Sequence, residues 1–222
     1  AALVSRTAQL FNHRPMGRLL HFPFSIIHSQ LTCINYRFLY ILIFGGKTME
    51  TITFTADLER NIRMMQELFR NDDTLIIRRA IGQNGLRCAL FFFDGMVNSL
   101  AINQSLVRPI LRCEQPRLSA DILAAAVLQA DECRVETDMN KVFAAFLYGD
   151  AIVLTDGDAR PVLVNTKGFD KRSTAEPENE RVLSGPREGF TEAFMGNLAL
   201  IRRRLRTPNL CFEFSGIGSV TH

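Results

Sequence analysis

Histidine is almost absent from the sequence. Three of the four histidines fall within the first 28 residues and the fourth is residue 222, so residues 49–221 contain none. Histidine is the most frequent general acid or base in enzymes. The sequence also has no Gly-x-Ser-x-Gly turn, no His-Glu-x-x-His helix and no glycine-rich dinucleotide turn. These absences predict a protein that is not an enzyme.

Paired cysteines and other metal-binding patterns are also missing. The five cysteines are odd in number, widely spaced and never arranged as Cys-x-x-Cys, which favours buried apolar thiols in a reducing compartment. The segment Asp156–Asp158 begins like a calcium loop but has no Glu at the twelfth position, so we expect a hairpin turn there. No metal and no cofactor is predicted.

No hydrophobic run is long enough to cross a bilayer. The longest, Phe38–Phe44, is far shorter than the roughly 20 residues that a transmembrane helix needs. Acidic residues are missing from residues 1–48, which hold five Lys and Arg, so residues 49–222 hold 21 basic and 23 acidic residues. This slightly acidic balance gives no reason to expect a nucleic-acid partner.

Composition divides the chain into four parts. Residues 1–48 mix His, Pro, Phe and Arg without a sustained period. We interpret them as a foreign or disordered extension upstream of a natural start at Met49, and a cleaved signal segment is the alternative. Residues 49–168 are predicted to form a first α/β subdomain, residues 169–188 a turn-rich linker, and residues 189–222 the incomplete start of a second α/β subdomain.

Helices and hairpins alternate along the first subdomain. Helices are expected after the N-cap candidates Thr55, Ser119 and Asp138, and another passes through residues 100–107 and is bent or ended near Pro109. Strands are predicted over residues 75–81, 86–93, 133–136, 151–154 and 161–164. The alternation favours an α/β fold, with α+β still open, in which helices flank a mixed β-sheet.

A further helix is predicted over residues 190–206. Steps of four, three and four place its apolar residues on one face, which we expect to be buried: Phe194, Leu198, Ile201 and Leu205. Pro208 ends the helix, and residues 210–214 are predicted to form a strand.

Four arginines gather at the end of this helix: Arg202, Arg203, Arg204 and Arg206. Basic residues complement the negative C-terminal end of a helix, so a structural or inter-subunit role is the first interpretation. Contact with anionic lipid or a membrane domain is the second, and nucleic acid is the third. Upstream, Ser184–Pro186 suggests an anion-binding turn, but Pro186 removes a backbone donor and favours a simple tight turn.

The C-terminal part of the chain carries a family resemblance. Ser184–Glu192 and Asn197–Leu205, preceded by Glu176-Pro177, strongly resemble the hallmark stretch of GerA-type spore germination receptor A subunits. Weaker similarity in the order of elements extends the resemblance over residues 55–218. We therefore identify the chain as similar to the N-terminal soluble region of that family, ending inside the second subdomain.

The resemblance implies a function and partners. It implies a module that acts in spore germination through subunit assembly and signal transfer, on the cytosolic side of the inner spore membrane. The implied partners are the receptor B and C subunits, further copies of the A subunit, and the membrane through a domain outside this chain. The candidate interaction residues are Arg187, Glu188, Glu192, Asn197, Arg202 and Arg204.

A binding role of a different class stays open. A cleft between two α/β subdomains is a common site for a small ligand. The alternative function is therefore a bilobal module that binds a small molecule, although the sequence shows no convergent set of polar residues for it.

Overall fold

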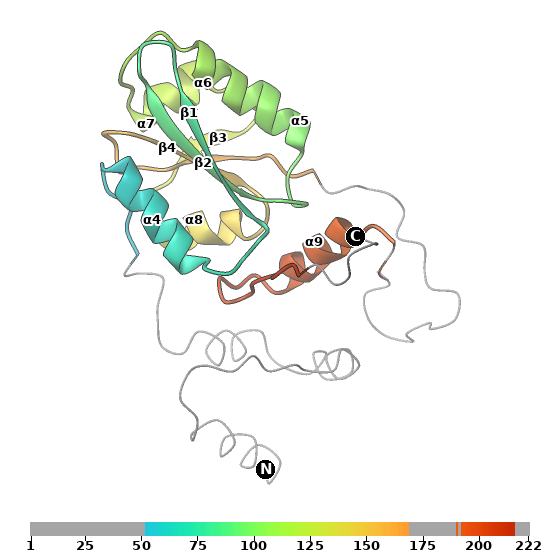
Figure 1. The fold of residues 1–222 in the computed structure, drawn as a ribbon. Helices are drawn as coiled ribbons and strands as arrows, with labels where there is room; N and C mark the ends of the chain where they lie inside the picture. The colour runs from blue at the N-terminus through green and yellow to red at the C-terminus, as the bar shows by residue number, and fades with distance from the viewer. Residues whose placement is uncertain (1–51, 169–189, 191, 216–222) are drawn as a thin grey trace. The chain divides into compact units, whose positions relative to one another are not determined.

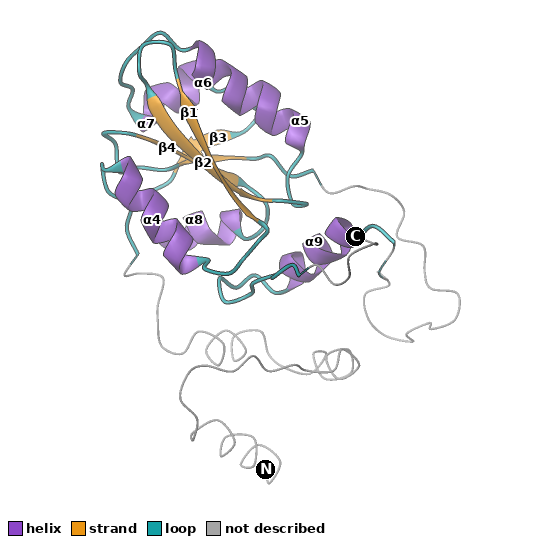
Figure 2. Cartoon of the chain, viewed as in Figure 1, coloured by secondary structure: helices purple, strands orange, loops and turns teal. Residues whose placement is uncertain are grey.

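Two antiparallel hairpins build the centre of the protein. The computed structural model describes residues 52–168, 190 and 192–215 (Figure 1). Its sheet has the strand order β1-β2-β4-β5-β3, and helices cover it (Figure 2). The strands are β1 (Leu75–Ile81), β2 (Arg87–Phe93), β3 (Cys133–Val135), β4 (Ala151–Thr155) and β5 (Val162–Val164).

The predicted α/β fold with flanking helices is confirmed, but the sheet differs in one detail. We expected a mixed sheet, and each of the four strand pairings that the structure describes is antiparallel. For two of the four pairings the reason lies in the connections. Tight turns join β1 to β2 and β4 to β5, and a tight turn can join only antiparallel strands.

Alternation along the strands produces two hydrophobic cores, one on each face of the sheet. On β2, Ala89, Phe91 and Phe93 belong to one core, while Cys88 and Leu90 belong to the other. This is the period of two that a strand buried on both faces must have.

Different helices cover the two faces (Figure 1). The first face is covered by α4 (Leu58–Leu68) and α8 (Met139–Phe146). The second face is covered by two longer helical stretches. The first stretch consists of α5 (Ser99–Ala101), η2 (Ile102–Val107) and α6 (Arg108–Arg112). The second consists of α7 (Ala120–Ile122) and η3 (Leu123–Val127). The η segments are π-helices.

Two of the three predicted helix caps are confirmed. Ser119 accepts a hydrogen bond from the N–H of Ile122, and Asp138 accepts one from the N–H of Asn140. The third prediction was wrong, because Asp57 and not Thr55 caps α4, accepting from the N–H of Arg60.

We predicted that the helix through residues 100–107 is bent or ended near Pro109. It does not end there, but changes from π-helix to α-helix at Arg108 and continues to Arg112. Pro109 has no N–H to donate, so the carbonyl of Ser105, four residues earlier, needs another partner. The N–H of Gln129 donates to that carbonyl at 3.0 Å. A bond from Gln129, which follows η3, thus provides a partner for this carbonyl.

The turn between β4 and β5 ties both helical layers to the sheet. The carboxylate of Asp156 accepts a hydrogen bond from the N–H of Leu58 at the start of α4. The carboxylate of Asp158 accepts one from the N–H of Ala120 at the start of α7, at 2.8 Å, and two more from the side chain of Arg160. As expected from the sequence, Asp156–Asp158 is a hairpin turn.

Two parts of the predicted organisation lie outside the described residues: the extension over residues 1–48 and the linker over residues 169–188. The described residues all fall within one compact unit. Whether residues 189–222 begin a second subdomain stays a prediction. Among the residues that the structure describes, no helix combines the length and apolar character needed to cross a membrane.

Candidate functional site

The helix α9 (Phe194–Arg204) docks on the domain through a buried arginine. Arg202 is 1% exposed, and its terminal nitrogen Nη2 lies 2.5 Å from Oδ2 of Asp72. The same nitrogen donates to the hydroxyl of Thr74 at 3.1 Å, and Nη1 donates to the carbonyl of Leu210 at 3.4 Å. One side chain of α9 therefore joins the turn before β1 to the segment after α9.

Aromatic rings enclose the guanidinium of Arg202. Its central carbon lies 3.9 Å from the ring centroid of Phe93 and 5.0 Å from that of Phe212. The electron-rich faces of aromatic rings attract a cation, and more strongly when water is excluded. Burial lowers the pKa of Arg202, and the nearby carboxylate of Asp72 opposes that shift. The carboxylate of Asp72 is thus the charge that balances the buried guanidinium.

The acceptor side of the ion pair is equally ordered. The Oδ1 atom of Asp72 accepts from both the N–H and the hydroxyl of Thr74, at 3.1 Å and 2.6 Å. Oδ2 is left for Arg202. Both carboxylate oxygens thus have donors, which is the condition under which a buried ion pair is tolerated. Asp72 and Thr74 are both buried, so the ion pair is largely shielded from solvent.

The residues after α9 also bond to the Asp72 turn. The N–H of Asp73 donates to the carbonyl of Phe212 at 2.9 Å, and the N–H of Phe214 donates to the Asp73 carboxylate at 2.6 Å. We had predicted a strand over residues 210–214, and this was wrong, because the segment has no regular strand pairing. The Asp73 carboxylate, and not the carbonyl of a neighbouring strand, accepts the hydrogen bond from the N–H of Phe214.

The predicted buried face of α9 was wrong at Phe194, while Leu198, Ile201 and Leu205 are half-buried. Phe194 is 58% exposed, and the buried residues of the helix are Ala199 and Arg202. Of the arginines near the end of the helix, Arg202 alone is buried, while Arg204 and Arg206 are exposed. Sequence periodicity places Arg202 among polar surface residues, because nothing near it in the chain reveals its partner 130 residues away.

The remaining candidate interaction residues fall into three groups. Glu192 and Arg204 are exposed, and Asn197 is half-buried, with its N–H donating to the carbonyl of Ala193. Arg187 and Glu188 lie outside the described residues. Arg202 was predicted to face a neighbouring protein, and the structure corrects this, since its guanidinium is enclosed within the chain.

The N-terminal end of α9 approaches the sheet at a glycine. Gly95 follows β2 with φ +76°, and a Cβ atom there would lie 3.0 Å from the carbonyl oxygen of Met195. Both the positive φ and the close approach call for glycine. α9 therefore touches the domain at Gly95 near its start and at Asp72 near its end.

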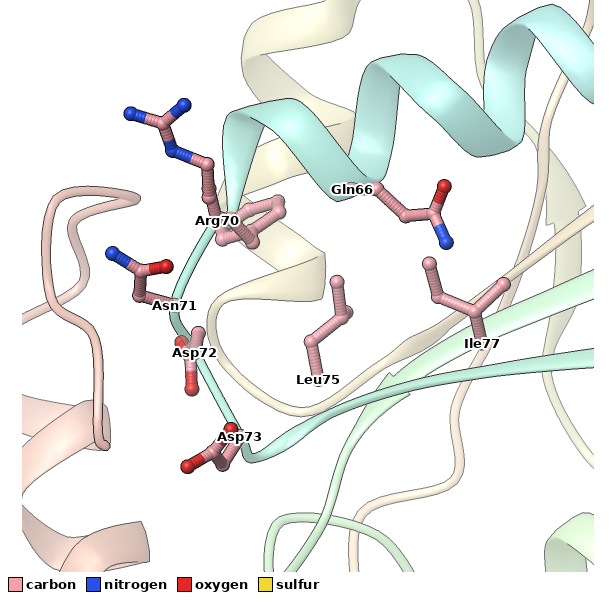
Figure 3. A pocket seen from close by; sticks show the side chains of 8 residues that line it. Gln66, Arg70, Asn71, Asp72, Asp73, Leu75 and Ile77 are labelled. Carbon is pink, nitrogen blue, oxygen red and sulfur yellow. The ribbon is translucent and has the colours of Figure 1, made fainter. Parts of the chain in front are cut away.

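A hollow of about 340 Å³ lies beside the Asp72 turn. Figure 3 shows Asn71, Asp72 and Asp73 following one another along the turn that forms one side of it. Its charged groups are already engaged. Asp72 pairs with Arg202, Asp73 accepts from Phe214, and Arg70 lies 3.5 Å from Glu67. These bonds leave few polar groups here to orient a small ligand.

Within the described ranges, no group of three or more His, Cys, Asp or Glu side chains is arranged to hold a metal ion. The functional features of this region are instead a docked helix, its buried ion pair and its outward charged residues. Sequence reasoning missed Asp72, Thr74, Phe93 and Phe212 as partners of Arg202. No local signal in the sequence distinguishes the buried Asp72 from its neighbour Asp73.

The fold and this site define an α/β domain that carries a C-terminal helix docked by a buried arginine. The chain belongs to the Bacillus/Clostridium GerA spore germination protein family, whose model matches residues 63–222. A crystal structure of the N-terminal domain of the A subunit of the Bacillus megaterium spore germinant receptor GerK3 has a similar fold. The TM-score is 0.52 at 22% identity, covering 77% of this chain and 63% of that one.

Several full-length relatives contain a similar region. Spore germination protein KA of Bacillus subtilis is 29% identical over 77% of this chain and 32% of its own length. Spore germination protein GerLA of Bacillus cereus is 29% identical over 76% of this chain and 34% of its own. An uncharacterised membrane protein of Bacillus subtilis, YfkQ, is 31% identical over 75% and 33%. The chain thus spans about a third of these relatives.

Proposed function

We propose that this chain is the N-terminal module of a nutrient germinant receptor A subunit. In this proposal it acts in spore germination by assembling with the receptor B and C subunits and passing a signal to them. It works at the inner membrane of the spore, which the subunit enters through a domain outside this chain. Further copies of the A subunit are additional candidate partners. The role is one of binding and transmission, with no catalytic step.

One observation carries the proposal, and it is the two-sided construction of α9. The inner side is fixed to the domain by Arg202, whose guanidinium is enclosed. Arg204 of the helix and Glu192, two residues before the helix begins, are exposed to solvent. A partner that binds these outer charges acts on a helix rigidly connected to the sheet. Such a helix can transmit a change in position, which an isolated surface loop cannot.

Charge reversal at Arg204 tests this role. We expect Arg204→Glu to reduce the amount of B and C subunits that co-purify with the A subunit, because opposite charges at interfaces guide association and like charges oppose it. Arg112→Glu is the matched control, since Arg112 is an exposed arginine at the end of α6, a helix on the opposite face of the sheet. Unchanged co-purification with Arg204→Glu would count against the proposal.

Folding must be checked in the same preparations. Arg204 is exposed and outside the buried network, so its replacement is expected to leave the midpoint of thermal unfolding nearly unchanged. A loss of partners together with a large fall in that midpoint would indicate misfolding and not a lost contact.

The small-ligand alternative has a separate test. A ligand that binds only the folded state raises the unfolding midpoint by mass action. We propose screening amino acids, sugars, nucleosides and salts in this way. Flat melting curves across the screen would eliminate the alternative, and they would leave the assembly role untouched.

A further inference from the structure

Three large apolar side chains are exposed on the helical layer that covers the second face of the sheet (Figure 1). Leu100 of α5 is 62% exposed, Leu111 of α6 is 45% exposed and Ile122 of α7 is 48% exposed. The second helical stretch approaches the first where the N–H of Gln129, which follows η3, donates to the carbonyl of Ser105 in η2. This layer therefore presents apolar groups to solvent from both of its stretches.

Arginines without a carboxylate partner accompany these apolar side chains. Arg108 and Arg112 are exposed on α6, and within the part of the chain that the structure describes neither forms an ion pair. Arg78 of β1 is exposed as well, and its Nη1 donates at 2.8 Å to the neutral side chain of Asn103 in η2. Three guanidinium groups thus lie on or beside one helical stretch.

Acidic residues offset little of this charge. Residues 95–130 contain two acidic residues, Glu114 and Asp121. The carboxylate of Asp121 already pairs with Arg160 at 2.7 Å, which leaves Glu114 against three arginines. The surface that results is both apolar and positive, and we call it the leucine–arginine surface. It consists of Leu100, Leu111, Ile122, Arg78, Arg108 and Arg112.

We propose that the leucine–arginine surface binds an anionic lipid bilayer. Exposed leucines on a surface helix enter the boundary between headgroups and acyl chains, and nearby arginines are attracted to negatively charged lipids. Protein interfaces are instead enriched in aromatic residues, and residues 99–112 and 120–127 contain none. This lipid contact rests on the proposed location of the subunit at a membrane, and it specifies which face of the module meets the lipid.

A tryptophan at position 100 reports the contact locally, because the sequence contains no other tryptophan. The whole chain carrying Leu100→Trp is mixed with vesicles of equimolar phosphatidylglycerol and phosphatidylcholine. We expect its emission to shift to shorter wavelength and to be quenched by brominated lipid, and both effects to weaken as added salt screens the charges. Vesicles of phosphatidylcholine alone should cause little change. Gln66→Trp is the matched control, since Gln66 is exposed on α4 over the first face, and its emission should not respond.

Charge reversal tests the role of the arginines. Each basic residue near an anionic surface contributes a factor of about five in affinity. Arg108→Glu in the Leu100→Trp protein should therefore raise the lipid concentration at half of the shift at least about tenfold. Arg63→Glu makes the same reversal at an exposed arginine of α4 and should have little effect. An unshifted emission of Leu100→Trp, equal shifts of the two probes, or equal effects of the two reversals would overturn the lipid contact.

The lipid contact and the partner-subunit proposal fail separately. Co-purification of the B and C subunits is tested at Arg204, with Arg112→Glu as its control. In the vesicle assay Arg112→Glu should weaken binding, as Arg108→Glu does, while it leaves co-purification unchanged. If Arg204→Glu reduces co-purification but the Leu100→Trp emission does not respond to vesicles, then the lipid contact alone is wrong.

Discussion

The guanidinium of Arg202 and the carboxylate of Asp72 meet at 2.5 Å across 130 residues of sequence, and neither side chain is more than 1% exposed. Burying two charges costs several kcal/mol for each ion, and only good geometry with further hydrogen bonds compensates. Thr74, Leu210, Phe93 and Phe212 provide those further contacts. The pair thus fixes one docked position of α9.

The contact between α9 and Gly95 predicts a difference between two glycine substitutions. Gly95 and Gly85 both have positive φ, but only at Gly95 would a Cβ atom meet another group, the Met195 carbonyl. An L side chain at such φ costs roughly 1–2 kcal/mol at either position. We expect Gly95→Ala to destabilise the protein more than Gly85→Ala and to speed hydrogen exchange in α9. Urea unfolding and peptide-level exchange measure the two effects, and equal values would contradict the close approach.

The turn at Asp158 predicts an acid-sensitive contribution to stability. Burial raises the pKa of Asp158, but hydrogen bonds from the Arg160 side chain and from the N–H groups of Ala120 and Arg160 outweigh it and hold the pKa at about 2. A lowered folded-state pKa stabilises the protein above the unfolded-state value of about 3.9, and this stabilisation is lost as the pH falls through 2.

Asp158→Asn isolates that contribution. The free energy of unfolding of wild type should exceed that of the variant most clearly above pH 4, and the difference should shrink as the pH falls toward 2. Denaturant unfolding over that range provides the measurement. A difference that stays constant with pH would show that the Asp158 carboxylate has no special stabilisation.

The cysteines predict an order of reactivity. Burial raises the pKa of the Cys88 thiol to about 12, so almost no thiolate is present near neutral pH. Cys211 is exposed. We expect iodoacetamide to label Cys211 in the native protein and Cys88 only after denaturation. Mass spectrometry of the peptides distinguishes the sites, and labelling of native Cys88 at a rate similar to Cys211 would contradict its burial.

Much of the fold could be predicted because its signals are local. The caps at Ser119 and Asp138, and the tight turn at Asp156–Asp158, depend on residues within a few positions of each other. The antiparallel pairing of β2 with β4 could not be predicted in this way, because about 60 residues separate these strands and propensity does not specify a distant partner.

The candidate site was harder to predict than the fold, because its contacts join residues that are far apart in the sequence. Apolar periodicity selected Phe194, which is exposed, and treated Arg202 as a surface residue. Apolar periodicity predicts the buried face on the assumption that apolar side chains point inward and charged ones outward. A buried ion pair violates that assumption. The resemblance to the germination receptors was visible in the sequence, but the role of Arg202 required the three-dimensional contact with Asp72.

The proposed transmission of a signal through α9 depends on this contact. A double-mutant cycle with Arg202→Met, Asp72→Asn and the combined variant measures it in urea unfolding. Each single substitution leaves one charge or polar group unpaired, so we expect a loss of about 3–5 kcal/mol for each. Glu67→Gln is the control, because it removes only the exposed pair with Arg70 and should cost under about 1 kcal/mol.

The most direct test is the interaction energy from that cycle. The account predicts that the combined variant loses less stability than the two single variants together, by about 0.5–3 kcal/mol, because the second substitution removes a partner already lost. If the two losses simply add, or if Arg202→Met costs no more than Glu67→Gln, then α9 is not held to the domain by Arg202 and Asp72.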